Sequence, residues 1–181
     1  MAFACNVEKT GSNALKFDVS KATVNDLKGI VELINAEAKK SGAVLLVSEK
    51  EVGVWIKSGL DFVAKDESGK IIGHQSAAIW PESGWIELRA GVVLPEFRGN
   101  GVNSKLKVAI INEIESKFPG ATIVSLKNNV SGGRGTVAEL GFHKVQQSEA
   151  PEELFKIGPK GENYDVYVYT TKIAEKGLLR S

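Results

Sequence analysis

Cysteine and histidine are scarce in this sequence of 181 residues, which contains one cysteine, Cys5, and two histidines. A single cysteine excludes an intramolecular disulfide framework and a metal site made of several sulfur ligands, because both require more than one thiol. His74 and His143 lie far apart in the chain, so we expect neither a histidine-rich metal site nor an H-E-x-x-H protease motif. We interpret both as surface or hydrogen-bonded structural residues, and we predict no metal cofactor and a cytoplasmic location.

An excess of charge of one sign is also lacking, since 23 Lys+Arg stand against 22 Asp+Glu and the formal net charge is +1. No basic block is large enough for a nucleic-acid footprint, so the sequence predicts no nucleic acid among the partners. Two acidic clusters, at residues 66–67 and 148–153, are interpreted as solvated loops. No apolar run approaches the ~18 residues of a membrane-spanning helix, and the first residues lack the basic and apolar regions of a secretory signal. We therefore expect neither membrane insertion nor secretion.

Local patterns divide the chain into an arm, one domain and a tail. Residues 1–14 are polar and unpatterned, so we expect a flexible N-terminal arm. Hydrophobic residues make up 43% and charged residues 25% of the chain, as in ordinary globular proteins. The length is typical of one domain. We expect residues 15–173 to form a single domain, followed by a C-terminal tail at 174–181.

The expected domain begins with a strand and two helices. Residues 15–22 alternate as a strand does, and two capping boxes follow, T-x-x-D at 23–26 and S-x-x-E at 48–51. Each box opens an amphipathic helix, and Gly59 is placed to end the second one. The buried stripe of the first helix is predicted to consist of Leu27, Ile30, Val31, Ile34 and Ala38.

Three apolar runs between Leu60 and Leu94, separated by the turn sequences D-E-S-G and P-E-S-G, predict an antiparallel meander. After Pro95 a period of about 3.6 residues predicts a long helix. Its apolar positions are Val102, Leu106, Ile110, Ile114 and Phe118. We expect the intervening polar residues to form its solvated face: Lys105, Lys107, Asn112, Glu113 and Lys117.

The remaining segments complete the order β, α, α, β, β, β, α, β, α, β, β. Residues 121–126 indicate a buried strand, and residues 136–142 indicate a short helix that ends in a Gly-Phe corner. Residues 164–173 are rich in β-branched and aromatic side chains and predict the last strand.

The most informative segment is the glycine-containing turn before the long helix. Gly99 and Gly101 have no Cβ atoms where a ligand would approach the backbone. The free N–H groups in the first turn of a helix, at the positive end of its dipole, suit phosphate oxygens. The turn is not a Walker A loop, because it lacks the G-K-[ST] ending. A plain connector without a ligand is the alternative interpretation.

The pattern V-x-P-x-x-R-G-x-G at residues 93–101 resembles the acetyl-CoA signature of the GCN5-related N-acetyltransferase (GNAT) family. Residues 136–142 are similar to a second recurrent segment of that family, and the order of elements resembles its fold over residues 15–173. The resemblance implies an α+β fold in which helices flank a mixed, mostly antiparallel sheet. It also implies an N-acetyltransferase that uses acetyl-CoA as cosubstrate.

The resemblance places acetyl-CoA at an opening between the fourth and fifth strands. The cofactor-binding residues that it implies are Val93, Leu94, Arg98, Gly99, Asn100, Gly101, Val102, Asn103, Ser104 and Asn128, or Asn129 in place of Asn128. Asn103 departs from the family pattern, where Gly or Ala is usual, and we expect its side chain to point outward. Val137 stands where the general-acid tyrosine of the family is expected. Solvent, or one of three tyrosines of the last strand, would then protonate the leaving thiolate: Tyr164, Tyr167 or Tyr169.

Glu87 matches, by resemblance, the position at which several family members carry a glutamate general base. Acetyl transfer to an amine requires attack geometry, removal of a proton and stabilisation of an oxyanion. On a regularly alternating strand, Glu87 would share one face with Arg89, Gly91 and Val93. The alternative interpretation of Glu87 is an exposed residue that contributes only to solubility.

The sequence gives limited information on which amine accepts the acetyl group. Three segments resemble amino-acid N-acetyltransferases of the N-acetylglutamate synthase type: residues 21–34, 42–52 and 78–101. This resemblance implies a small amino acid as the acceptor, and Arg89 could bind its carboxylate in a bidentate contact. Lys39 and Lys40 are either further cations for the acceptor or a solvated helix end.

Several alternatives stay open at this point. Polyamines, aminoglycoside-like amines, a lysine side chain and a protein N-terminus are other acceptors. A non-catalytic acyl-CoA-binding module is a competing function, since Asn103 and Val137 depart from the family pattern. We expect acetyl-CoA and a small-molecule amine as partners, no membrane, and a homodimer as one possible assembly.

Overall fold

The computed structural model describes residues 15–42, 44–127, 134–156 and 164–171. Its helices are α1 (Leu27–Ser41), α2 (Glu49–Ser58), α3 (Val102–Lys117) and α4 (Arg134–Glu139). Its strands are β1 (Phe17–Lys21), β2 (Asp61–Asp66), β3 (Ile71–Ile79), β4 (Ile86–Val93), β5 (Thr122–Lys127), β6 (His143–Val145) and β7 (Asp165–Thr170). The order predicted from the sequence is confirmed. The expected arm at 1–14 and tail at 174–181 lie outside the described residues.

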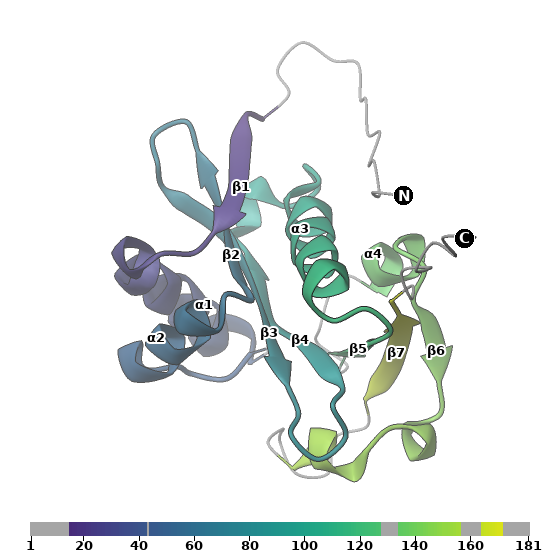
Figure 1. Ribbon diagram of the computed structural model, residues 1–181. Helices are drawn as coiled ribbons and strands as arrows, with labels where there is room; N and C mark the ends of the chain where they lie inside the picture. Colours follow the sequence, from purple (N-terminus) through teal and green to yellow (C-terminus); the bar gives the residue numbers. More distant parts are fainter. Residues whose placement is uncertain (1–14, 43, 128–133, 157–163, 172–181) are drawn as a thin grey trace, which may run out of the picture.

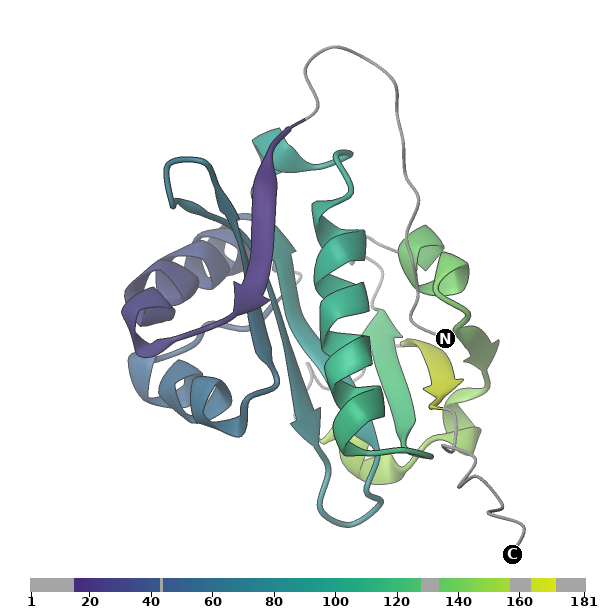
Figure 2. The ribbon, with the colours of Figure 1, turned by 45° about the horizontal axis from the view of Figure 1, so that its top comes forward.

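The seven strands form one sheet in the order β1-β2-β3-β4-β5-β7-β6. Of the described strand pairs, only β4 and β5 run parallel. Helices α1 and α2 cover one face of the sheet, and α3 and α4 cover the other (Figure 1). Figure 2 shows α3 lying along its face of the sheet. The expected α+β fold with a mixed, mostly antiparallel sheet is therefore confirmed.

The second helix begins where its capping box predicts, and the first begins three residues after the start that its box predicts. Ser48 precedes α2, where its hydroxyl accepts from the Glu51 N–H at 3.3 Å and its own N–H donates to the Glu51 carboxylate at 2.8 Å. Thr23 donates to Asp26 in the same way, but a short 3-10 turn at Val24–Asp26 comes before α1. Local sequence thus fixes the start of α2 and of the 3-10 turn that leads into α1.

Two apolar clusters, one on each face, hold the helices against the sheet. The larger lies under α3 and α4 and includes Leu106, Ile110, Ile114 and Val137. The smaller lies under α1 and α2 and includes Ile30, Ile34 and Val52. Burial of such side chains contributes roughly 25 cal/mol per Å² of apolar surface, so the apolar stripes of α1 and α3 account for where these helices lie.

One residue of α3 overturns the sequence expectation. Lys107 was expected on the solvated face, yet it is 2% exposed and its Nζ donates to Gln75 Oε1 at 2.6 Å. Residues 106, 110 and 114 are fully buried, and α3 turns enough of its surface toward β2 and β3 to bury position 107 as well. The polar residues Lys105 and Lys117 remain exposed, as expected.

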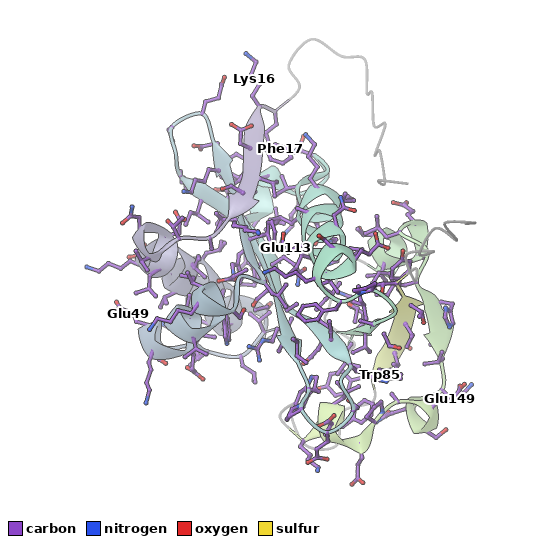
Figure 3. The ribbon with its side chains drawn as sticks, in the orientation of Figure 1. Lys16, Phe17, Glu49, Trp85, Glu113 and Glu149 are labelled. Atoms are coloured by element: carbon purple, nitrogen blue, oxygen red, sulfur yellow. The ribbon has the colours of Figure 1, made fainter. Side chains whose placement is uncertain are left out.

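The acidic segment at 148–153 is also not fully solvated. Glu153 is 4% exposed and accepts from the backbone N–H of Ser83 at 2.8 Å and of Glu82 at 3.4 Å. Burial raises the pKa of Glu153, but the hydrogen bonds from Ser83 and Glu82 outweigh burial and lower it overall. Trp85, labelled in Figure 3, packs in a third cluster with Leu154. These contacts fasten the β3–β4 hairpin to the segment after β6.

No described helix is long and apolar enough to cross a lipid bilayer.

Candidate active site

Strands β4 and β5 pair over a short stretch and then separate. Their register contains two pairs, Ile86 with Ile123 and Glu87 with Val124. From Leu88 to Val93 the β5 side of β4 has no strand partner among the described residues, although β4 stays paired with β3 on its other side. The unpaired edge starts beside Glu87 and leads directly into the glycine turn.

The glycine turn adopts the backbone conformation that glycine favours. Gly99 has φ +79° and Gly101 has φ +78°, and a Cβ on either residue would meet no atom within 4 Å. Gly101 caps α3, whose first hydrogen bond runs from the Lys105 N–H to the Gly101 carbonyl at 3.0 Å. The N–H groups of Val102, Asn103 and Ser104 precede that bond and are available to an anion.

Arg98 stabilises the turn from within. Its Nε donates to the Val93 carbonyl at 3.0 Å, and its Nη2 forms an ion pair with Glu37 of α1 at 2.9 Å. The Asn100 side chain donates to the Arg98 carbonyl at 3.1 Å. Val93 and Val102 are buried, with 9% and 1% exposure, so their side chains anchor the turn and only their backbone faces a ligand.

The Asn103 side chain was expected from the sequence to point outward, and the structure shows that it does not. It is half-buried, and its Nδ2 lies 3.4 Å from Thr136 Oγ1 of α4. A residue in the first turn of α3 reaches α4 because both helices pack on the same face of the sheet. Ser104 is half-buried beside it. Asn128 and Asn129 lie outside the described residues.

Glu87 is half-buried on β4 and accepts a hydrogen bond from Trp80 Nε1 at 3.0 Å. Burial raises the pKa of Glu87, while the bond from Trp80 and the positive charge of Arg89 partly oppose that shift. A carboxylate with a raised pKa accepts a proton more readily near neutral pH, as a general base must.

Arg89 lies two residues further on and stacks on Trp55 of α2, with the guanidinium carbon 4.7 Å from the ring centroid. Burial lowers the pKa of Arg89, whereas the nearby carboxylates of Glu87, Asp61 and Glu51 raise it. Its Nε is buried and has no hydrogen-bond partner among the described residues. Arg89 is therefore a partly desolvated cation that can still donate to an anion.

The alternation of side chains along β4 is interrupted. The prediction that four residues share one face of this strand is therefore correct for two of them and wrong for the other two. Glu87 and Arg89 do face the α1 and α2 side, but Gly91 and Val93 face α3. The β3–β4 register shifts between His74 and Ser76, which is a β-bulge. Ala90, at the bulge, has φ +51°, a conformation that costs a residue with a Cβ roughly 1–2 kcal/mol.

Two buried pairs next to the bulge are not suggested by any sequence motif. On the α1 and α2 side, His74 Nε2 lies 2.6 Å from Asp61 Oδ1, and both side chains have no solvent exposure. On the α3 side, Lys107 binds Gln75, and burial, followed by the charge of Lys127, lowers the pKa of Lys107 well below its usual value. The one local signal in the sequence is the pair of polar residues His74 and Gln75 within an otherwise apolar run.

The candidates for a general acid are placed as follows. Val137 is fully buried in the core, so this position offers an apolar wall and no proton. Tyr169 donates to Glu115 at 2.5 Å, and burial together with this bond raises its pKa to about 12, which makes it a poor proton donor. Tyr164 packs against Phe155, and Tyr167 is half-buried over the α3 cluster.

The sequence matches the model of the acetyltransferase (GNAT) family over residues 32–142, which is more than half of the chain. The chain therefore belongs to the GNAT acetyltransferase family. No curated protein gives a significant match to the sequence.

Solved structures share the fold at low sequence identity. N-acetylglutamate synthase from Neisseria gonorrhoeae, solved with coenzyme A and N-acetyl-glutamate, superposes with a TM-score of 0.71 at 20% identity, covering 86% of this chain and 35% of the synthase. This chain thus spans about a third of that protein. A GNAT acetyltransferase from Staphylococcus aureus Mu50 gives a TM-score of 0.71 at 13% identity, covering 87% and 100% of the two chains. Phosphinothricin acetyltransferase from Sinorhizobium meliloti, solved with acetyl-CoA, gives 0.67 at 18%, covering 91% and 99%.

Proposed function

We propose that this protein transfers the acetyl group of acetyl-CoA to the primary amine of a small amino acid. The observation that carries this proposal is the arrangement on β4. A half-buried glutamate, a partly desolvated arginine, an unpaired strand edge and a glycine turn at a helix N-terminus follow one another within residues 87–104.

The pyrophosphate of acetyl-CoA fits the turn because the turn offers backbone donors and open space. The N–H groups at the start of α3 point away from the helix, and no atom lies within 4 Å of a Cβ built on Gly99 or Gly101. Arg98 contributes mainly to the shape of the turn, since its guanidinium is bound to Val93 and Glu37. The β5 side of β4 beyond Glu87, which has no strand partner in the part of the chain that the structure describes, can bind the amide groups of the pantetheine arm.

The chemistry requires one acyl transfer and two proton transfers, one from the amine and one to the leaving thiolate. The neutral amine attacks the thioester carbonyl, so that a C–N bond forms while the C–S bond breaks and coenzyme A leaves as a thiolate. Glu87 takes the proton that the amine nitrogen must lose, directly or through water. The thiolate takes a proton from solvent, because it is already a good leaving group near neutral pH.

Arg89 supports an acceptor that carries a carboxylate. Its guanidinium lies on the same face of β4 as Glu87, and the guanidinium carbon lies over the Trp55 ring, 4.7 Å from the ring centroid. Bidentate binding of a carboxylate suits this geometry. The synthase from Neisseria gonorrhoeae, solved with N-acetyl-glutamate, makes glutamate the first acceptor to test.

The test is a thermal shift with coenzyme A, acetyl-CoA and ADP, followed by a thiol-release assay with a panel of amino acids. A ligand that binds only the native state stabilises it by ~2.7 kcal/mol at a hundredfold excess over its Kd. We expect a shift with both coenzyme A ligands and thiol release that depends on the amino acid. No shift at millimolar coenzyme A would contradict the proposal.

A non-catalytic acyl-CoA-binding module is the second candidate, and the buried Val137 favours it, because the position expected for a general acid holds none. A thermal shift without thiol release for any amine would support this second function over the first.

A further inference from the structure

At the β4 bulge, two successive carbonyl groups are bound by two successive side chains of β3. Gln75 Nε2 donates to the Arg89 carbonyl at 2.8 Å. His74 Nδ1 lies 2.8 Å from the Ala90 carbonyl. His74 and Gln75 are neighbours on a strand and point to opposite faces of the sheet, so the bulge is bound from both sides.

Each of these two side chains is in turn held by a buried ionisable group. Asp61 on β2 binds His74 at 2.6 Å, and Lys107 on α3 binds Gln75 at 2.6 Å. None of the four side chains belongs to a residue more than 2% exposed. Buried carboxylates and ammonium groups are costly in a core and are rarely fully buried unless paired, which separates this arrangement from ordinary packing.

The hydrogen-bond geometry also fixes where the protons are. The Ala90 carbonyl can only accept, so His74 Nδ1 must carry a hydrogen. The 2.6 Å contact between His74 Nε2 and Asp61 Oδ1 needs a second hydrogen, on either the ring or the carboxyl. The pair therefore holds two protons in total. Lys107 likewise orients Gln75, because the Gln75 amide oxygen can only accept and Lys107 Nζ donates to it.

The bulge has a direct consequence for the site. It lets Glu87 and Arg89 face the α1 and α2 side while Val93, only four residues later, faces α3 and leads into the glycine turn. Without the extra residue, one of these two sets would face the wrong side, because side chains on a strand alternate. A side chain at Gly91 would meet Gln75 Oε1 at 2.6 Å, so the clamp also requires glycine there.

We propose that Asp61, His74, Gln75 and Lys107 form a clamp of positioning residues for acetyl transfer, which holds the bulge so that Glu87 and Arg89 meet the acceptor. This inference rests on the proposed function. The clamp residues act through the backbone of β4 and touch neither substrate.

The first test concerns the protons and needs no substrate. The chain has two histidines, His74 and the exposed His143, so ¹⁵N-histidine NMR with a His143→Asn variant assigns both rings. We expect a proton on His74 Nδ1 in the parent protein. In Asp61→Asn, we expect this proton to exchange with solvent faster than in the parent. An unprotonated Nδ1 would overturn the clamp.

The second test separates positioning from stability. His74→Leu and Lys107→Met remove a donor, whereas His74→Asn keeps an N–H near the Nδ1 position. We expect the two apolar variants to lower kcat by about 10²-fold, with the coenzyme A thermal shift and the KM for acetyl-CoA little changed. His74→Asn should recover most of kcat. Acetyl-CoA and the amino acid that gives the most thiol release in the panel serve as substrates.

Val52→Ala is the matched control, since Val52 is a fully buried residue of the cluster under α1 and α2. If the clamp variants lose activity only in proportion to their loss of folded protein, as Val52→Ala should, the clamp is wrong. If the parent protein releases no thiol with any amine, the proposed function fails instead, and the histidine NMR shows separately whether the buried pair is as described.

Discussion

Partial burial changes what Glu87 can do, because a carboxyl group that loses solvent holds its proton more tightly. The Trp80 bond keeps the side chain in place, and Arg89 limits the rise of the pKa. At the scale of single residues, the site therefore combines a base of increased strength with a nearby cation that remains available to an anion.

We expect Glu87→Gln to lower kcat by ~10²-fold or more, in the range for loss of a general base. The thermal shift with coenzyme A should not change, because Glu87 is not in the glycine turn. Glu67→Gln, an exposed residue of the β2–β3 turn, is the control and should keep full activity. Equal activity of both variants would remove Glu87 from the mechanism.

The same substitution should reveal the raised pKa of Glu87 in the stability of the protein. A pKa that is higher in the folded than in the unfolded state means that stability is lost as the pH rises through the folded value. Glu87→Gln should therefore be more stable than the parent at pH 7–8, and the difference should vanish below the ordinary glutamate pKa of 4.5. Urea unfolding at several pH values measures it, and a pH-independent difference would contradict burial as the cause.

Arg89 should control the affinity for the acceptor. A hydrogen bond to a charged group contributes about 1.5–3 kcal/mol, so Arg89→Gln should raise the KM for the amino acid roughly 10- to 100-fold without raising the KM for acetyl-CoA. Lys57→Gln, an exposed cation of α2, is the matched control. If the parent acetylates an amino acid and its α-carboxamide equally well, Arg89 does not bind the α-carboxylate.

The glycine turn shows how an element contributes more than its side chains. Gly99 and Gly101 combine a left-handed backbone with open space around the missing Cβ, and α3 adds N–H groups that its own helix leaves unbound. The resulting surface consists of backbone, so its function depends on conformation and access rather than on residue chemistry.

Gly101 and Gly69 allow these two factors to be separated. Both have a positive φ, +78° and +83°, and a Cβ added to either would have no atom within 4 Å. Alanine at either should cost a similar ~1–2 kcal/mol of stability. Only Gly101→Ala should weaken coenzyme A binding in a competition assay. Loss of affinity in both variants would indicate a global effect, and unchanged affinity in Gly101→Ala would exclude the turn as the binding site.

At the scale of the whole molecule, the β3–β4 hairpin contacts a segment that is distant in the sequence. Glu153 binds the N–H groups of Glu82 and Ser83, some seventy positions away in the chain. We expect Glu153→Ala to lower the Tm, because both N–H groups lose their acceptor, whereas Glu152→Ala, an exposed neighbour, should not. Thermal unfolding followed by circular dichroism measures the difference, and equal Tm values would contradict it.

Features that depend on nearby residues could be predicted from the sequence. The capping boxes at Thr23 and Ser48, the meander and the glycine turn follow from local propensity and alternation, and Glu87 and Arg89 share a face as a two-residue period requires. The bulge at Ala90, the burial of Lys107 and the stacking of Trp55 on Arg89 depend on partners in other elements. Alternation therefore failed just beyond Arg89, where pairing with β3 overrides the local pattern.

The place of β7 between β5 and β6 affects the order in which the protein can fold during synthesis. β7 pairs with β5 along six residues and with β6 along three, yet it is the last of the described strands to leave the ribosome. Until it emerges, β5 and β6 expose strand edges that can pair with other chains. The half of the sheet beyond the site therefore forms only after β7 has been synthesised, while β1 to β4 can assemble earlier.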